Sequence, residues 1–92
     1  MFDAAHIASN GITVQYVDMG VEYSYKGHTM RFVGEQQQGE VELDDAYYAE
    51  YSFNDELDAI ELRNMDSDEV FATIANTDEA YEAYVLQVLQ AL

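Results

Sequence analysis

Residues 12–32 have the sequence ITVQYVDMGVEYSYKGHTMRF, in which apolar and polar side chains alternate in three short runs. An alternation with a period of two is typical of strands that bury one face. The runs are separated by Asp18-Met19-Gly20 and by Lys26-Gly27-His28, which place Gly and Asp where hairpin turns need them. We therefore expect three antiparallel strands whose shared apolar face consists of Ile12, Val14, Tyr16, Val21, Tyr23, Tyr25, Met30 and Phe32.

The alternation continues through residues 40–53, where the odd positions are mostly apolar and the even positions include several acids. This period favours one strand over the whole segment. A helix is the alternative, because Leu43, Tyr47 and Tyr51 are spaced four residues apart.

Polar stretches predict the remaining turns. Residues 34–39, with the sequence GEQQQG, predict a loop, and residues 54–56 predict a turn. After that turn, Ile60 and Leu62 are expected to face inward on a last strand. The N-terminal segment predicts one helical turn that ends at Asn10.

The C-terminal third has helical signals. Ser67 and Thr77 each precede a pair of acids, as a capping residue does at the start of a helix. We expect one helix that is broken near Asn76, or two short helices. Leu86 lies off the main apolar stripe, where a homodimer seam is the alternative to packing on the sheet. The stripe itself consists of Tyr81, Tyr84, Val85, Val88, Leu89 and Leu92.

Together these elements predict the fold class. Residues 1–92 form a single acidic α+β domain, in which a small antiparallel β-meander is covered on one face by the C-terminal helix or by two short helices. With 49% hydrophobic residues the chain has enough apolar surface to fold, but it is too short for a multi-domain enzyme.

The composition also bounds the compartment. The chain has no Cys, so it has neither disulfides nor thiolate zinc sites. It shows no apolar run long enough to span a membrane and no recognisable secretion signal. We therefore expect a cytoplasmic protein.

Charge is the strongest clue to function. The chain has 19 acidic and 3 basic residues, a formal net charge of −16. Residues 1–34 hold three acids and two cations, a net −1, whereas residues 35–92 hold 16 acids and Arg63 alone, a net −15. Such a chain repels phosphate, which argues against direct binding of nucleic acid or of anionic lipid. We expect a near-neutral scaffolding half and an acidic half that binds a basic partner.

Catalytic signals are weak. His6 and His28 have neither a Ser and Asp grouping nor a Gly-rich phosphate loop to act with, so we expect no enzyme and no cofactor. Asp66-Ser67-Asp68 begins like a calcium loop, but the Gly and the twelfth-position Glu that such a loop requires are missing. We expect no metal site.

The acidic half holds the candidate binding residues. Alternate carboxylates on a strand lie about 6.6–6.8 Å apart, close to the rise between every second phosphate of one DNA strand. Tyr48 falls on the acidic side of that strand and is the candidate exposed anchor at an interface. The other candidate partner-binding residues are Glu40, Glu42, Asp44, Asp45, Glu50, Asp55, Glu56, Asp58, Glu61, Asp66, Asp68 and Glu69.

In small size, negative charge and lack of Cys, Pro and catalytic groupings, the chain resembles phage-encoded DNA-mimic inhibitors, such as anti-CRISPR and antirestriction proteins. The resemblance rests on residues 35–92. It implies an inhibitor that occupies the basic nucleic-acid channel of a bacterial defence complex, for example a CRISPR effector, in the host cytoplasm.

Two other kinds of protein share this composition. An immunity protein or antitoxin that neutralises a basic nuclease would have the same size and charge. A halophile-adapted domain would also be acidic, but salt adaptation acidifies the whole surface, whereas residues 1–34 are almost neutral.

Overall fold

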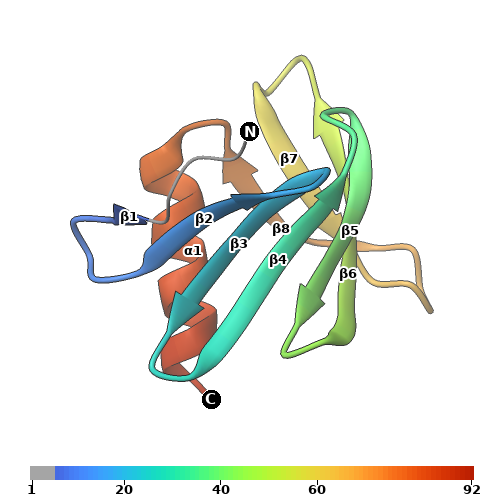
Figure 1. Cartoon of the computed structure of the whole chain (residues 1–92). Helices are drawn as coiled ribbons and strands as arrows, with labels where there is room; N and C mark the ends of the chain where they lie inside the picture. Colours follow the sequence, from blue (N-terminus) through green and yellow to red (C-terminus); the bar gives the residue numbers. More distant parts are fainter. Residues whose placement is uncertain (1–5) are drawn as a thin grey trace.

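The computed structural model describes residues 6–92, which form one eight-stranded sheet and one helix (Figure 1). The strands follow one another in the sheet in chain order, and every neighbouring pair is antiparallel. The predicted α+β fold with an antiparallel meander is confirmed. The elements are β1 (His6–Ile7), β2 (Thr13–Val17), β3 (Gly20–Tyr25), β4 (His28–Gly34), β5 (Gln38–Leu43), β6 (Ala46–Asn54), β7 (Ala59–Arg63), β8 (Val70–Ala75) and α1 (Asp78–Gln90).

The first hairpins turn where the sequence predicted. Asp18 and Met19 form the β2–β3 turn, and Lys26 and Gly27 form the β3–β4 turn. Lys26 and Gly27 have φ angles of 50° and 85°, and positive φ at both central residues is the pattern of a type I′ hairpin turn. In the β2–β3 turn only Met19 has a positive φ, of 63°. The helical turn expected before Asn10 is wrong where the structure describes it, because β1 lies there; the first five residues of that prediction lie outside the described range.

Residues 40–53 form two strands rather than the one strand or helix that we expected. Asp44 and Asp45 form the turn between β5 and β6, with φ angles of 48° and 67°. Asp adopts the left-handed region more readily than most residues, because its short polar side chain can form local hydrogen bonds. These two acids therefore lie at an end of the sheet and not along a strand.

A β-bulge in β6 explains why the apolar alternation runs unbroken through this turn. Glu42 pairs with Tyr47 and Val41 pairs with Ala49, which leaves Tyr48 as an extra residue. After the two-residue turn, β6 begins with an even-numbered residue, Ala46, on the apolar face. The extra residue shifts this by one position, so that from Ala49 onward the odd-numbered residues lie on the apolar face again. As a result Tyr48 packs against the core and Tyr47 is 40% exposed, so the expected exposed position of Tyr48 is wrong.

Only one of the two capping residues begins a helix. The side chain of Thr77 accepts a hydrogen bond from the backbone N–H of Ala80 at 3.1 Å, and α1 follows directly. Ser67 lies in the β7–β8 loop, and the segment after it is β8, so the helix expected there is wrong. The sequence VFATIA of β8 is rich in β-branched and aromatic residues, which pack well on a strand.

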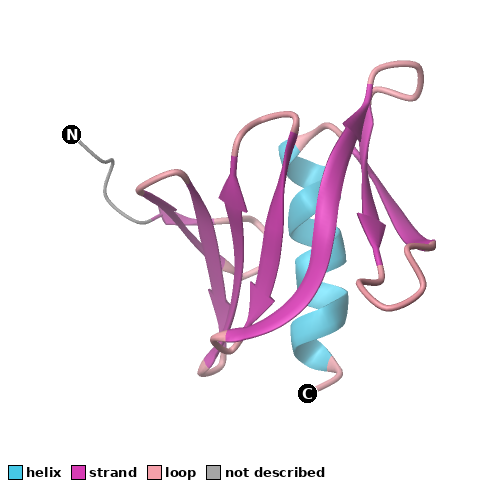
Figure 2. Cartoon of the chain, turned by 90° about the vertical axis from the view of Figure 1, so that its right-hand side faces the viewer, coloured by secondary structure: helices cyan, strands magenta, loops and turns pink. Residues whose placement is uncertain are grey.

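The sheet curves around α1, which fills its concave side (Figure 2). The helix packs against β3 and β4 and also against β8 at the far end of the strand order. Val85 and Leu89 of α1 are buried there, and Ile60 and Leu62 face inward as predicted. Leu86, which we considered for a dimer seam, packs against the same core. The other buried hydrophobic residues are Ala8, Ile12, Val14, Tyr23, Met30, Phe32, Val41, Ala49, Ala59 and Ile74.

Candidate interaction surface

We call the sheet face opposite α1 the outer face. Directly paired residues of neighbouring strands share a face, so the register fixes its composition. Four predicted acids, Glu40, Glu42, Glu50 and Glu61, lie together on β5, β6 and β7. The side chains that the outer face presents include Gln15, Glu22, Arg31, Glu40, Glu42, Tyr47, Glu50, Glu61 and Arg63.

Arg31 joins two of these carboxylates across three strands. Its guanidinium lies 2.7 Å from Glu22 on β3 and 3.2 Å from Glu42 on β5. The hydrogen bonds to Glu22 raise the pKa of Arg31 further, and Glu42 adds to the effect. Residues 1–34 therefore contribute an ion-pair network to the outer face. Their expected role as a scaffold stays a prediction.

Glu40 and Glu50 lie directly opposite each other on β5 and β6. Arg63 is opposite Glu50 on β7, but its guanidinium is within ion-pair distance of Glu61 alone, at 3.4 Å. Within residues 6–92, neither Glu40 nor Glu50 has an ion-pair partner. Like charges directly opposite on a sheet are destabilising, so this pair costs stability.

Tyr47 is the exposed aromatic residue of the outer face, next to Glu42 across the strands. Partial burial raises its pKa first, and the carboxylates of Glu50, Glu40 and Asp66 raise it further. Tyr47 thus has the surroundings that we had predicted for Tyr48. The sequence alternation could not identify it, because the bulge is invisible in that pattern.

Asp44 is bound into its turn. Its carboxylate accepts a hydrogen bond from the backbone N–H of Thr29 at 2.8 Å, and its other oxygen lies 2.8 Å from Nδ1 of His28. The N–H of Thr29, and then His28, hold the pKa of Asp44 below its ordinary value. Asp44 therefore ties the β5–β6 turn to the start of β4, whereas its neighbour Asp45 is exposed.

Two asparagines order the acidic loops. The Oδ1 atom of Asn54 accepts a hydrogen bond from the backbone N–H of Glu56 at 3.0 Å, in the β6–β7 turn. In the β7–β8 loop, Oδ1 of Asn64 accepts one from the backbone N–H of Asp66 at 2.8 Å. Such local bonds fix the turn backbone. The exposed acids of these two loops are Asp55, Glu56, Asp58, Asp66, Asp68 and Glu69.

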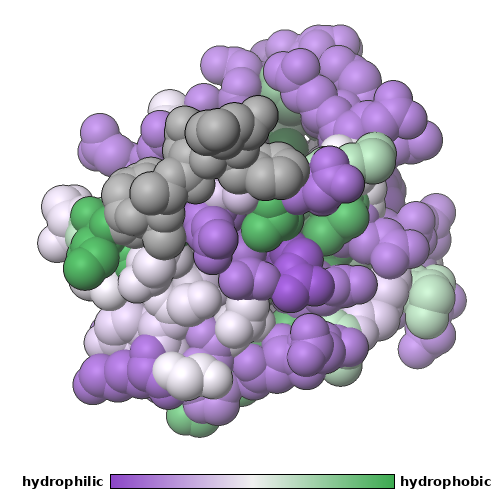
Figure 3. All heavy atoms as spheres, viewed as in Figure 1, coloured by the Kyte–Doolittle hydropathy of each residue, from purple (hydrophilic) through white to green (hydrophobic). Residues whose placement is uncertain are grey.

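The predicted acids thus form one band. Its centre is the outer face of β5, β6 and β7, and the acidic turns continue it at the two ends of those strands. Figure 3 shows hydrophilic side chains gathered at the top of the view, over the β6–β7 turn. We call this surface the acidic band, which consists of Glu40, Glu42, Asp45, Glu50, Asp55, Glu56, Asp58, Glu61, Asp66, Asp68 and Glu69.

A groove of about 480 Å³ crosses part of the acidic band. Its charged lining residues are Glu35, Glu40, Glu50, Arg63 and Asp68, four carboxylates against one guanidinium. Such a lining favours a cationic side chain over a phosphate or a carboxylate.

The described residues show neither a cluster of metal-ligating side chains nor a membrane-spanning helix. In residues 6–92, no three His, Asp or Glu side chains are grouped as metal ligands, and no helix has the length and apolar character of a membrane span. Comparison of the chain with protein-family models, curated proteins and solved structures gives no match. We therefore infer the function from the geometry and charge of the outer face.

Proposed function

We propose that this chain is a binding protein without catalytic activity, which covers a basic nucleic-acid-binding surface of another protein with its acidic band. The target to test first is the DNA channel of a bacterial defence complex, such as a CRISPR effector. Carboxylates in place of phosphates release the same counterions from such a channel and speed the encounter by long-range attraction.

The observation that carries this proposal is the unneutralised pair of Glu40 and Glu50. The two carboxylates face each other on the outer face, and no cation of residues 6–92 is in ion-pair contact with them. Their repulsion weakens the isolated fold, and a cation from a partner relieves it. Binding to a basic surface therefore gains from an arrangement that folding alone disfavours.

The carboxylates of the band are not equivalent. Glu42 and Glu61 are already in contact with Arg31 and Arg63, which orient them and offset part of their charge. Glu40 and Glu50 have no ion-pair contact within residues 6–92, and Tyr47 beside them offers an exposed ring of the type enriched at interface hot spots. We expect the binding energy to concentrate on this centre.

Competition for DNA tests the proposal. The measurement is the equilibrium binding of fluorescent target DNA to a purified effector complex, with increasing amounts of this protein. We expect the protein to prevent DNA binding when it is added first and to be much less effective when excess DNA is added first. Two results contradict occupancy of the DNA channel. One is an electrophoretic shift of free DNA by this protein, and the other is inhibition that is not reduced when excess DNA is added first.

A charge-matched pair of variants locates the surface. Glu40→Lys/Glu50→Lys changes the net charge by the same amount as Asp18→Lys/Glu79→Lys, whose residues are exposed but lie off the acidic band. Close interface charge pairs couple by about 1.5–7 kcal/mol each, so the first variant should lose at least about 100-fold in affinity. Equal losses in both variants would assign binding to net charge alone.

The panel of partners should include a restriction enzyme and a basic nuclease toxin beside the CRISPR effectors. Inhibition of the toxin alone would assign the same band to an immunity protein or antitoxin. If none of the three classes is inhibited, the proposed function is wrong.

A further inference from the structure

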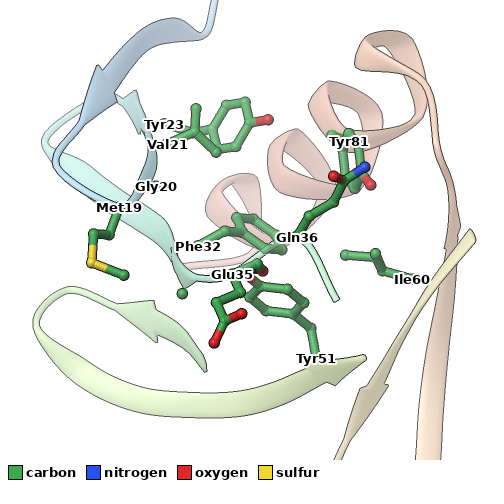
Figure 4. A pocket seen from close by; sticks show the side chains of 11 residues that line it. Met19, Gly20, Val21, Tyr23, Phe32, Glu35, Gln36, Tyr51, Ile60 and Tyr81 are labelled. Atoms are coloured by element: carbon green, nitrogen blue, oxygen red, sulfur yellow. Dashed lines mark hydrogen bonds between the residues drawn. The ribbon is translucent and has the colours of Figure 1, made fainter. Parts of the chain in front are cut away.

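A second, chemically different pocket lies between the concave face of the sheet and the start of α1. It has a volume of about 250 Å³, below the roughly 300 Å³ at which pockets for drug-sized ligands begin, so it suits only a small group. Figure 4 shows its lining, with rings from β3, β4, β6 and α1 around one space. The four rings belong to Tyr23, Phe32, Tyr51 and Tyr81.

Phe32 is the centre of this aromatic group. Its ring centroid lies 5.8 Å from that of Tyr23 and 6.2 Å from those of Tyr51 and Tyr81. The ring of Tyr51 lies over Gly39, where an added Cβ would come within 2.5 Å of the ring. The glycine of β5 therefore makes room for one wall of the pocket.

Two of the tyrosine hydroxyls are held by the protein. The hydroxyl of Tyr51 donates to the backbone carbonyl of Glu35 at 2.6 Å, and that of Tyr81 donates to Oδ1 of Asn76 at 2.9 Å. These bonds fix the two rings at the mouth of the pocket, so the space between them is shaped before any ligand arrives.

The hydroxyl of Tyr23 is different. Tyr23 is only 5% exposed, and its hydroxyl has no hydrogen-bond partner within residues 6–92. Figure 4 shows this oxygen directed from β3 toward the helix, at the edge of the pocket. Burial first, and then the charges of Asp78 and Glu82, raise the pKa of Tyr23. This hydroxyl is not fully enclosed and no residue of 6–92 bonds to it, so it is available to a ligand.

The charge around the pocket selects the ligand class. Glu35 lines the mouth, and Asp58, Asp78 and Glu82 are close enough to act on the ring hydroxyls. The chain's Lys and Arg residues are absent from its lining. The N-terminus of α1 brings about half a positive charge, which the full charge of Asp78 outweighs. Ring faces are also negative, so the site favours a cation.

We propose that this aromatic pocket binds a small organic cation, a guanidinium or alkylated ammonium group, with the ring faces around it and the Tyr23 hydroxyl as an acceptor or neighbour. The pocket shares Glu35 and Tyr51 with the groove that crosses the acidic band, but no residue of the acidic band lines it. This proposal does not depend on the proposed function. The shared chemistry is an organic cation that lies against aromatic rings, which free trimethylammonium compounds carry as a quaternary ammonium and arginine side chains as a guanidinium. Binding experiments can distinguish these two sources.

Matched ligands isolate the charge. Choline and 3,3-dimethyl-1-butanol have the same shape, as do N-acetyl-arginine amide and N-acetyl-citrulline amide, but only the first member of each pair is a cation. Chemical-shift titrations of the full chain should show saturable binding of at least one cation, about tenfold tighter than its neutral partner. The pair of compounds that shows this preference identifies the source of the cation.

Two variants test the location. Tyr23→Phe removes a hydroxyl that no described residue holds, and Glu35→Gln removes one charge from the mouth. Each should weaken cation binding several-fold. Tyr16→Phe and Glu69→Gln are the matched controls, because neither residue lines the pocket, and they should leave binding unchanged.

Three results would overturn this proposal. They are equal binding of cation and neutral partner, no saturable binding of any of the four compounds, and shifts that spread over the acidic band instead of the pocket. Each of these outcomes leaves the competition experiment with DNA unaffected, so the two proposals fail or succeed separately.

Discussion

The hydroxyl groups of Tyr48 and Tyr84 lie 2.8 Å apart and join the bulge of β6 to the middle of α1. Tyr48 is the extra residue of the bulge, and its side chain turns toward the helix because of it. Burial first, and then the bond to Tyr48, raise the pKa of Tyr84. The contact couples the curvature of the sheet to the position of the helix.

This pair gives the first prediction. Tyr48→Phe and Tyr84→Phe should each lower the free energy of unfolding by about 1 kcal/mol, because each leaves one half-buried hydroxyl without its partner. The double variant should cost less than the sum of the two, as measured by urea unfolding. Tyr16→Phe is the control and should change stability by less than about 0.5 kcal/mol. Additive losses would mean that the hydrogen bond is not formed in solution.

The alternation of residues 12–32 was sufficient to predict three strands, because Gly and Asp mark the turns between them. In residues 40–53 the same pattern did not reveal the turn. The two-residue turn moves the apolar face from odd-numbered to even-numbered residues, and the one-residue bulge moves it back, so the alternation looks unbroken. Turn chemistry at Asp44-Asp45 was the only local signal. The capping pattern at Ser67 predicted a helix in the segment that follows it, but that segment forms β8, because it pairs with β7.

Part of the candidate site could likewise be predicted. The outward-facing positions of Glu40, Glu42 and Glu50 followed from their even numbers, and the structure agrees, although Glu42 is half-buried beside Arg31. The contact of Arg31 with Glu22 and Glu42 could not be predicted. It depends on the register of three strands, which one sequence does not specify.

The opposed carboxylates of Glu40 and Glu50 give the second prediction. Glu40→Gln should stabilise the protein at low salt by about 0.5 kcal/mol, because it removes a like-charge pair, and the gain should shrink as salt screens the repulsion. Thermal unfolding over a salt series measures both. Glu69 lies in a loop and has no such like-charge pair, so Glu69→Gln should raise the stability by less. A wild-type chain that is unfolded until salt becomes molar would instead indicate halophilic adaptation.

The third prediction concerns alkaline pH. Burial raises the pKa of Tyr23 and of Tyr84, so the folded state keeps protons that the unfolded chain loses above about pH 10. Their contribution to stability is therefore complete below pH 10 and is lost as the pH rises further. Tyrosinate absorbance and circular dichroism over one pH series should show that the last tyrosines ionise together with unfolding. Ionisation of all eight with unchanged dichroism would contradict this.

Asp44 gives the fourth prediction, at acid pH. Its depressed pKa means that its stabilising bonds are present above about pH 4 and are lost as the pH falls through the folded-state value. Asp44→Asn should lower the thermal midpoint at neutral pH, and the difference from wild type should vanish in strong acid. Asp45→Asn is the matched control, because Asp45 also has a positive φ but makes no side-chain hydrogen bond within residues 6–92. Equal effects of the two variants would contradict a special role for Asp44.

The position of α1 after all eight strands has a consequence for synthesis. Each strand pairs with its neighbour in the chain, so the hairpins can form one by one as the ribosome releases them. Val85 and Leu89, which fill the concave side, are made after the whole sheet. Until they emerge, the apolar side of the nascent meander is open to water and to chaperones, and a stalled ribosome would display it.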